Sequence, residues 1–120
     1  MNFNETDEFT KDVKRLAKKY TSLPNDLLEF KKVVNKFPLG TSKHFTPLHI
    51  QGTITIIKAR LFCRYLKGSS LRIIYAYNKE QQLIEFMEMY FKGDKEKEDR
   101  ERIKKYYGKL GDKIPDSSSE

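Results

Sequence analysis

The sequence has one cysteine, no tryptophan and no long apolar run. A single cysteine, Cys63, cannot form an internal disulfide, so folding does not require an oxidising compartment. No stretch approaches the roughly 20 apolar residues that a transmembrane helix needs. The first seven residues are polar and acidic, unlike a signal peptide. For a chain of 120 residues we therefore expect one domain, located in the cytoplasm.

Acidic residues are absent from the middle of the chain. No Asp or Glu occurs between Phe30 and Lys79, a stretch that contains ten lysines and arginines. The formal net charge is +7, so the positive excess belongs to this middle stretch. Such an asymmetry attracts polyanions. The alternative is a solvated basic surface that serves solubility only.

Two amphipathic helices are predicted after a short, weakly alternating stretch at residues 1–5. Thr6 before two acidic residues is typical of a helix start, because its hydroxyl caps free N–H groups and the acids suit the positive helix end. Pro24 suits the first turn of a second helix, which Pro38 ends. The apolar stripes comprise Phe9, Val13, Leu16, Ala17 and Tyr20, and then Leu27, Phe30, Val34 and Phe37. The short connection predicts an antiparallel helical hairpin.

A β-rich half follows a predicted loop at Leu39–Gly52. Short turns separate three predicted strands, which form an antiparallel meander: Thr53–Leu66, Leu71–Tyr77 and Leu83–Phe91. Lys95–Leu110 is compatible with a last helix that is apolar only in its second half. The predicted fold is α+β, in the order β-α-α-β-β-β-α, with helices on one face of a twisted antiparallel sheet. The domain spans 1–110, and the serine-rich tail, 111–120, should be disordered.

Basic residues share one face of the first strand of the meander. Alternation places Lys58, Arg60 and Arg64 together, interleaved with Phe62, while Cys63 falls on the apolar face and is expected in the core. Cations and an aromatic ring on a sheet are the components of a platform for single-stranded nucleic acid. The alternative is an edge strand that charge protects from aggregation.

The next two strands add candidate reactive groups. Arg72 begins the second strand and should lie near Arg60 or Arg64 in the hairpin. Glu88, Tyr90 and Lys92 share a face of the last strand, and Glu85 falls on the opposite face with two methionines. Such a cluster could transfer protons and stabilise charge. Cross-strand ion pairs with little effect are the alternative, and spacing alone favours them.

The loop before the meander carries Lys43, His44 and His49. A metal pair is a weak interpretation because no Cys, Asp or Glu accompanies these histidines. Contacts to RNA or a role in proton transfer are plausible. The sequence has no phosphate-binding glycine loop, zinc signature or nucleophile elbow.

Several of these segments together resemble the RelE/ParE superfamily of toxins. Lys58-Ala59-Arg60, Leu66-Lys67-Gly68 and Leu71-Arg72-Ile73-Ile74-Tyr75 resemble the central hairpin of that superfamily. Residues 84–96 resemble its last strand and exit, and the N-terminal helix also fits. The resemblance covers residues 1–107 and depends on the order and spacing of short motifs.

The resemblance implies a microbial-RNase-like fold and the toxin of a toxin–antitoxin module. RelE-like members cut messenger RNA on the ribosome, where the 2′-hydroxyl attacks the neighbouring phosphorus and leaves a cyclic phosphate. Arg72, Lys58 and Arg60 match basic residues of the superfamily, and Tyr90 and Lys92 occupy the place of a catalytic residue. The histidine that many relatives carry there is missing. No cofactor or metal is implied.

The residues and the resemblance together give a hypothesis for each side chain. Arg72 and Arg60 would bind the scissile phosphate, Lys58 or Glu88 would accept the 2′-hydroxyl proton, and Tyr90 or Lys92 would protonate the leaving oxygen. The predicted RNA contacts are Lys43, His44, Phe62, Arg64 and Lys67.

Other functions remain open at this point. The ParE branch inhibits DNA gyrase without cutting RNA, a non-enzymatic RNA- or ribosome-binding protein could carry the same basic sheet, and a degenerate toxin could keep only the fold. A toxin of this kind implies an acidic, partly helical antitoxin, for which the basic middle of the chain is a suitable target.

Overall fold

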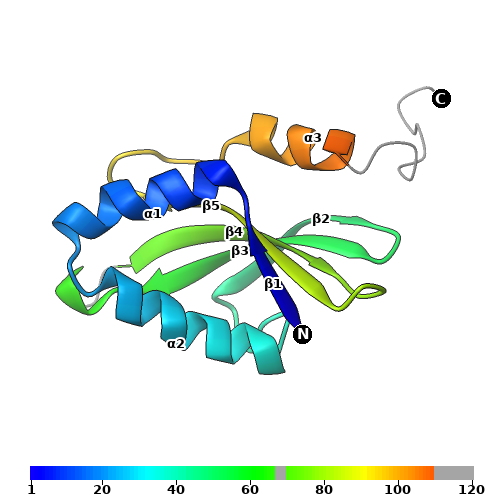
Figure 1. The fold of residues 1–120 in the computed structure, drawn as a ribbon, viewed down its shortest axis with the longest axis horizontal. Coiled ribbons are helices and arrows are strands. Elements are labelled where there is room, and N and C mark those ends of the chain that lie inside the picture. Colours follow the sequence, from blue (N-terminus) through cyan, green and yellow to red (C-terminus); the bar gives the residue numbers. More distant parts are fainter. Residues whose placement is uncertain (67–69, 110–120) are drawn as a thin grey trace.

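A five-stranded sheet with helices on both faces forms the core of the computed structural model, which describes residues 1–66 and 70–109 (Figure 1). The strand order is β1-β5-β4-β3-β2, antiparallel except for the parallel pairing of β1 with β5. This confirms the predicted α+β class. The elements are β1 (Asn2–Glu5), α1 (Asp7–Lys19), α2 (Leu23–Lys36), β2 (Phe45–Gln51), β3 (Ile54–Phe62), the 3-10 turn η1 (Arg64–Leu66), β4 (Ser70–Asn78), β5 (Leu83–Phe91) and α3 (Arg100–Lys109).

The two N-terminal helices cover one face of the sheet, as predicted. Thr6 caps α1, and its side-chain oxygen accepts a hydrogen bond from the Phe9 N–H at 3.1 Å. The apolar stripes of both helices pack against the alternate residues of β3, β4 and β5. Phe86 of β5 is fully buried among the rings of Phe3, Phe9 and Tyr75, and these rings join the helices to the sheet.

Part of the predicted loop is instead a strand. β2 pairs antiparallel with β3, with an irregular register between Pro47 and His49. Proline is tolerated there because β2 lies at the sheet edge and is bulged, so a missing N–H removes no central hydrogen bond. The sequence conceals the strand because the proline and the bulge interrupt alternation. The predicted strand Thr53–Leu66 is shorter, since the chain turns into η1 at Arg64.

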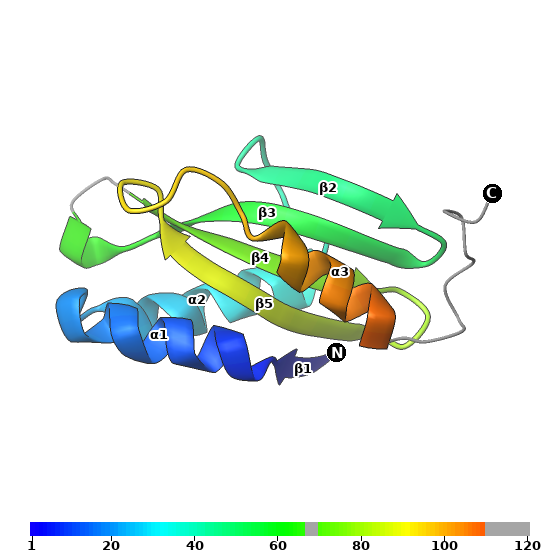
Figure 2. The same ribbon diagram turned by 90° about the horizontal axis from the view of Figure 1, so that it is seen from above.

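The structure differs from the prediction in the position of the last helix. α3 lies on the face opposite α1 and α2 (Figure 2) and begins at Arg100 rather than Lys95. Its apolar residues Ile103, Tyr106 and Tyr107 pack on a second cluster in the sheet that includes Ile56, Ile74, Ala76 and Met87. The helix therefore covers part of the face that the prediction left open.

A partly buried ion pair joins α3 to α1 beside β5. Asp12 accepts hydrogen bonds from Arg102 Nη1 at 2.6 Å, from Arg102 Nη2 at 3.2 Å and from the Met89 N–H at 3.0 Å. β1 pairs with residues 83–86 of β5 only, so Asp12 satisfies a strand N–H beyond the end of β1. A bidentate guanidinium–carboxylate pair of this kind fixes orientation as well as distance.

A bulge in β5 changes which side chains face α3. The register between β4 and β5 shifts between Ile74 and Tyr75, and a bulge places an extra residue in one strand. Glu85 and Met87 consequently line a cavity with Tyr106 of α3. The prediction that Glu85 and Met87 share the face of Met89 is therefore wrong, because it assumed unbroken alternation.

The predicted tail, 111–120, lies outside the described residues. Within residues 1–66 and 70–109, no helix is long and apolar enough to span a membrane.

The aromatic core gives a stability prediction with a matched control. Replacing the buried Phe86 with alanine should lower the free energy of unfolding by about 3–5 kcal/mol, because both burial and ring contacts are lost. The same substitution at Phe62, whose side chain is 55% exposed, should change it by less than about 1 kcal/mol. Urea unfolding of the two variants measures both values. Equal losses would contradict the described core.

Candidate nucleic-acid interface

Three neighbouring strands place Arg60, Arg72 and Tyr90 in one row. Arg60 of β3 is the register partner of Arg72 of β4, and Arg72 is the partner of Tyr90 of β5. Directly opposed side chains on one sheet face have Cβ atoms about 4.5–5.5 Å apart. Arg60 is exposed, Arg72 is half-buried and Tyr90 is buried. The predicted convergence of Arg60 and Arg72 is therefore present.

Neither guanidinium group has an acidic counter-ion within residues 1–66 and 70–109. Among the described residues no carboxylate forms an ion pair with Arg60 or Arg72. Burial, followed by the charge of Arg60, lowers the pKa of Arg72. An arginine nevertheless stays protonated in proteins. Two like charges side by side are destabilising, and an anion bound between them would relieve that cost.

Tyr90 is held in its neutral form. Burial, and after it the carboxylates of Glu98 and Glu88, raise the pKa of its phenol to about 12, while Arg72 opposes the shift. The hydroxyl is therefore protonated at neutral pH. It can donate a hydrogen bond or a proton but is a poor base.

Lys58 lies on the same strand face as Arg60 but is paired with an acid. Its ammonium donates to Glu98 Oε1 at 3.1 Å, and the Glu98 side chain is only 3% exposed. Arg100 contacts the other oxygen of Glu98 at 3.3 Å. Glu98 therefore holds the ammonium of Lys58, and Lys58 has to leave this contact before it can act on a bound RNA.

Glu88 is enclosed rather than available. Its side chain is 2% exposed, forms an ion pair with Lys95 and accepts a hydrogen bond from the Asp99 N–H at 2.7 Å. These contacts hold the segment between β5 and α3 against the sheet. The geometry therefore favours a structural role for Glu88, and its predicted role as proton acceptor remains untested.

The predicted RNA contacts fall into three groups. Phe62 is exposed and packs edge-to-face with His44 at a ring distance of 5.3 Å. Lys43, which directly precedes His44, is also exposed. Arg64 lies apart from them, near α2, and Lys92, a predicted catalytic residue, is exposed and directly follows β5. Lys67 lies outside the described residues.

Arg64 does not continue the basic face of β3. The strand ends at Phe62, and Arg64 in η1 lies 3.9 Å from Asp26 of α2, which packs on the other face. Its backbone N–H also donates to Asp26 at 3.2 Å. The alternation rule failed here because the chain leaves the sheet one residue earlier.

The remaining candidates, Cys63 and His49, pack against neighbouring side chains. Cys63 is buried in the core as predicted, and its sulfur lies 3.4 Å from Ser22 Oγ. His49 packs against the Tyr107 ring at 5.3 Å and contacts Gln51 at 3.3 Å. The part of the chain that the structure describes holds no group of three or more His, Cys, Asp or Glu side chains able to bind a metal ion.

Two polar residues of this region were not predicted from the sequence. Ser70 accepts a hydrogen bond from Arg72 Nη1 at 2.7 Å, and Glu98 neutralises Lys58. Strand alternation could have identified Ser70, which lies two residues before Arg72. No sequence signal distinguishes Glu98 from the other acids around it, because its partner is 40 residues away.

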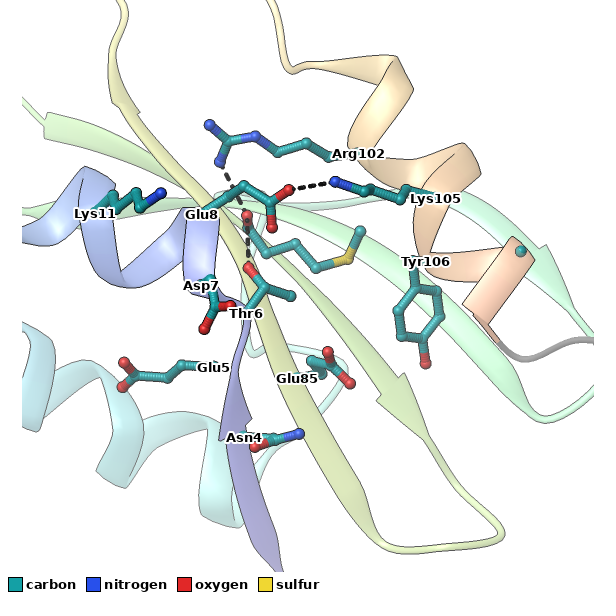
Figure 3. Close-up of a pocket in the computed structure, with 12 residues that line it drawn as sticks. Asn4, Glu5, Thr6, Asp7, Glu8, Lys11, Glu85, Arg102, Lys105 and Tyr106 are labelled. Atoms are coloured by element: carbon teal, nitrogen blue, oxygen red, sulfur yellow. Dashed lines mark hydrogen bonds and ion pairs between the residues drawn. The ribbon is translucent and has the colours of Figure 1, made fainter.

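A cavity of 770 Å³ lies elsewhere, between the start of α1, β5 and α3 (Figure 3). It contains neither arginine of the Arg60–Arg72 pair. Glu8 at its rim is paired with Lys105 at 2.8 Å, and Arg102 donates to the Met87 carbonyl at 3.1 Å. Both acidic and basic side chains line it, so it has no single charge preference.

The fold resembles that of a solved structure. The chain matches a chain of the archaeal RelE–RelB complex from Pyrococcus horikoshii OT3 with a TM-score of 0.59 and 22% sequence identity. The match covers 77% of this chain and 94% of the other. No family model and no curated protein sequence matches this one. At this identity the match shows a RelE-like fold.

The tyrosines around α3 predict a loss of stability at alkaline pH. Burial raises the pKa of Tyr90, Tyr106 and Tyr107 from 10.0 to about 12. Because the pKa is higher in the folded state, the neutral phenols contribute fully to the free energy of unfolding below pH 10. That contribution is lost as the pH rises towards 12. Ultraviolet titration should show late-ionising phenols, and Tyr90→Phe should remove one of them. Ionisation of all seven tyrosines near pH 10 would contradict the packing of α3.

Proposed function

We propose that the protein is the toxin of a toxin–antitoxin module and cleaves messenger RNA on the ribosome, in the cytoplasm. The observation that carries the proposal is the Arg60–Arg72 pair, which forms no ion pair with an acid of residues 1–66 and 70–109 and lies beside the protonated phenol of Tyr90. The fold supports it, because the similar archaeal chain comes from a RelE–RelB complex.

The reaction would be an attack by the RNA itself. The 2′-oxygen forms a bond to the adjacent phosphorus while the bond from phosphorus to the 5′-oxygen breaks. The products are a cyclic phosphate and a free 5′-hydroxyl. Arg60 and Arg72 would bind the phosphate and stabilise the charge of the five-coordinate transition state. Loss of one such contact costs roughly 3 kcal/mol of barrier.

Proton transfers would involve the groups around this pair. Tyr90 or Lys92 would protonate the leaving 5′-oxygen. Tyr90 suits that role because its phenol is neutral. Lys58 in its neutral amine form, released from Glu98, or the carboxylate of Glu88 would take the 2′-hydroxyl proton. Lys58 is the better placed, because its side chain is 30% exposed whereas that of Glu88 is 2% exposed.

RNA binding would extend from the phosphate site along β3. Phe62 is 55% exposed, and a base could stack on its ring, a contact worth about 1–3 kcal/mol. His44 packs against this ring, and Lys43 directly precedes His44 in the sequence. Lys67, another predicted contact, would contribute charge, whereas Arg64 lies against Asp26 of α2 and is not part of this surface. A 2′-hydroxyl is required, so DNA would bind without being cut.

An antitoxin is the expected protein partner. The similar archaeal chain was crystallised in a RelE–RelB complex. The acid-free middle of this chain offers a surface for an acidic, partly helical segment.

A translating extract tests the proposal. The purified chain should produce new RNA ends within codons, and Arg72→Ala should reduce them by about two orders of magnitude. Arg15→Ala is the matched control, because Arg15 is a 65% exposed arginine on α1 and its loss should leave cleavage unchanged. Intact RNA with inhibited supercoiling by gyrase would favour the ParE-like alternative. Intact RNA with both processes normal would leave an RNA-binding protein or a degenerate toxin.

The pair of Lys58 and Glu98 gives a second prediction, a gain of binding. Glu98→Gln should strengthen the binding of an uncleavable RNA, because it frees a lysine for a phosphate. The slope of log affinity against log salt concentration should steepen by about one released counter-ion. Glu96→Gln removes the same charge from an exposed position and should have little effect. Adding Lys58→Met should abolish the gain. Equal effects of the two glutamine variants would show that only net charge matters.

A further inference from the structure

Arg72 is held by a neutral partner, whereas several other cations near α3 are held by acids. Its Nη1 donates to the Ser70 hydroxyl at 2.7 Å and approaches the Ser70 carbonyl at 3.4 Å. By contrast, Arg102 binds Asp12, and Lys58 and Arg100 bind Glu98. The charge of Arg72 is therefore fixed in place without being neutralised.

Such a support is needed because of the neighbouring charge. Arg60 is the register partner of Arg72, and the two guanidinium groups repel each other. A long side chain without a partner also retains rotamer freedom, and ordering it costs up to about 2 kcal/mol. If the Arg72 side chain were not already ordered in the folded protein, this entropy would be lost when the substrate phosphate binds.

The hydrogen-bond pattern leaves one edge of the guanidinium for the substrate. A guanidinium carries five N–H groups, and the two on Nη1 are directed to the hydroxyl and the carbonyl of Ser70. The N–H groups of Nε and Nη2 form no hydrogen bond with the residues that the structure describes. Two parallel N–H groups on one edge match two oxygens of a phosphate.

We propose that Ser70 is a positioning residue, which holds Nη1 of Arg72 so that its Nε–Nη2 edge faces the scissile phosphate. This inference rests on the proposed function, because it assigns Arg72 to the phosphate. Ser70 acts through Arg72 and does not itself touch the RNA. A serine suits the role because a carboxylate at the same place would compete with the phosphate for the arginine.

Cleavage kinetics of the full-length chain on ribosome-bound messenger RNA test this role. Ser70→Ala should lower kcat about tenfold with little change in KM, because the hydroxyl contact is lost while the carbonyl remains. Ser70→Thr keeps the hydroxyl and should restore most of the activity. Ser70→Ala should cause no further loss when Arg72 is already alanine. Thr10→Ala removes an exposed hydroxyl on α1 and should leave the kinetics unchanged.

The outcomes separate the inference from the proposed function. An active Ser70→Ala alongside an inactive Arg72→Ala would overturn the positioning role, and so would equal defects in the alanine and threonine variants. A wild-type chain that cuts no RNA would overturn the proposed function. In that case binding of a 2′-O-methyl RNA decides the inference: several-fold weaker binding by Ser70→Ala, rescued by Ser70→Thr, supports it, and unchanged binding overturns it.

Discussion

The pairing of β3 with β4 forces two positive charges together. Arg60 and Arg72 are register partners, and neither forms an ion pair with an acid among residues 1–66 and 70–109. Directly opposed like charges weaken a sheet, so the fold tolerates a local cost at this point. Natural proteins keep such costs most often where they serve a function. An anion bound between the two groups would relieve this cost, and for that reason we propose a phosphodiester as the ligand.

The last helix defines the limits of that site. α3 covers the apolar part of the second sheet face through Ile103, Tyr106 and Tyr107. The segment before it brings Glu98 to Lys58 and Lys95 to Glu88, so these acids neutralise lysines and do not reach the two arginines. Tyr90 lies between the two environments, where burial and the acids keep its phenol protonated. This face of the sheet thus has one part that α3 covers with apolar contacts and one part that carries the two arginines.

Strand alternation was enough to predict the basic row but not its surroundings. Lys58, Arg60 and Phe62 follow the period of two, and Arg72 follows from the hairpin. The same rule misplaced Arg64, where the chain leaves the sheet, and Glu85, where a bulge resets the pattern. β2 was missed because a proline and a bulge conceal its alternation. Glu98 could not be placed, since its contact with Lys58 depends on the position of α3. These errors all concern breaks in regular structure or contacts between distant segments, which local pattern does not encode.

The central claim is that the Arg60–Arg72 pair binds the backbone of RNA, and the salt dependence of binding tests it most directly. Affinity for a 2′-O-methyl RNA strand is measured over a range of salt concentrations for the wild type, Arg60→Met, Arg72→Met and Arg15→Met. The account predicts that the slope of log affinity against log salt falls by about 0.7 for each of the first two variants and stays unchanged for Arg15→Met. Identical slopes for all four proteins would contradict it.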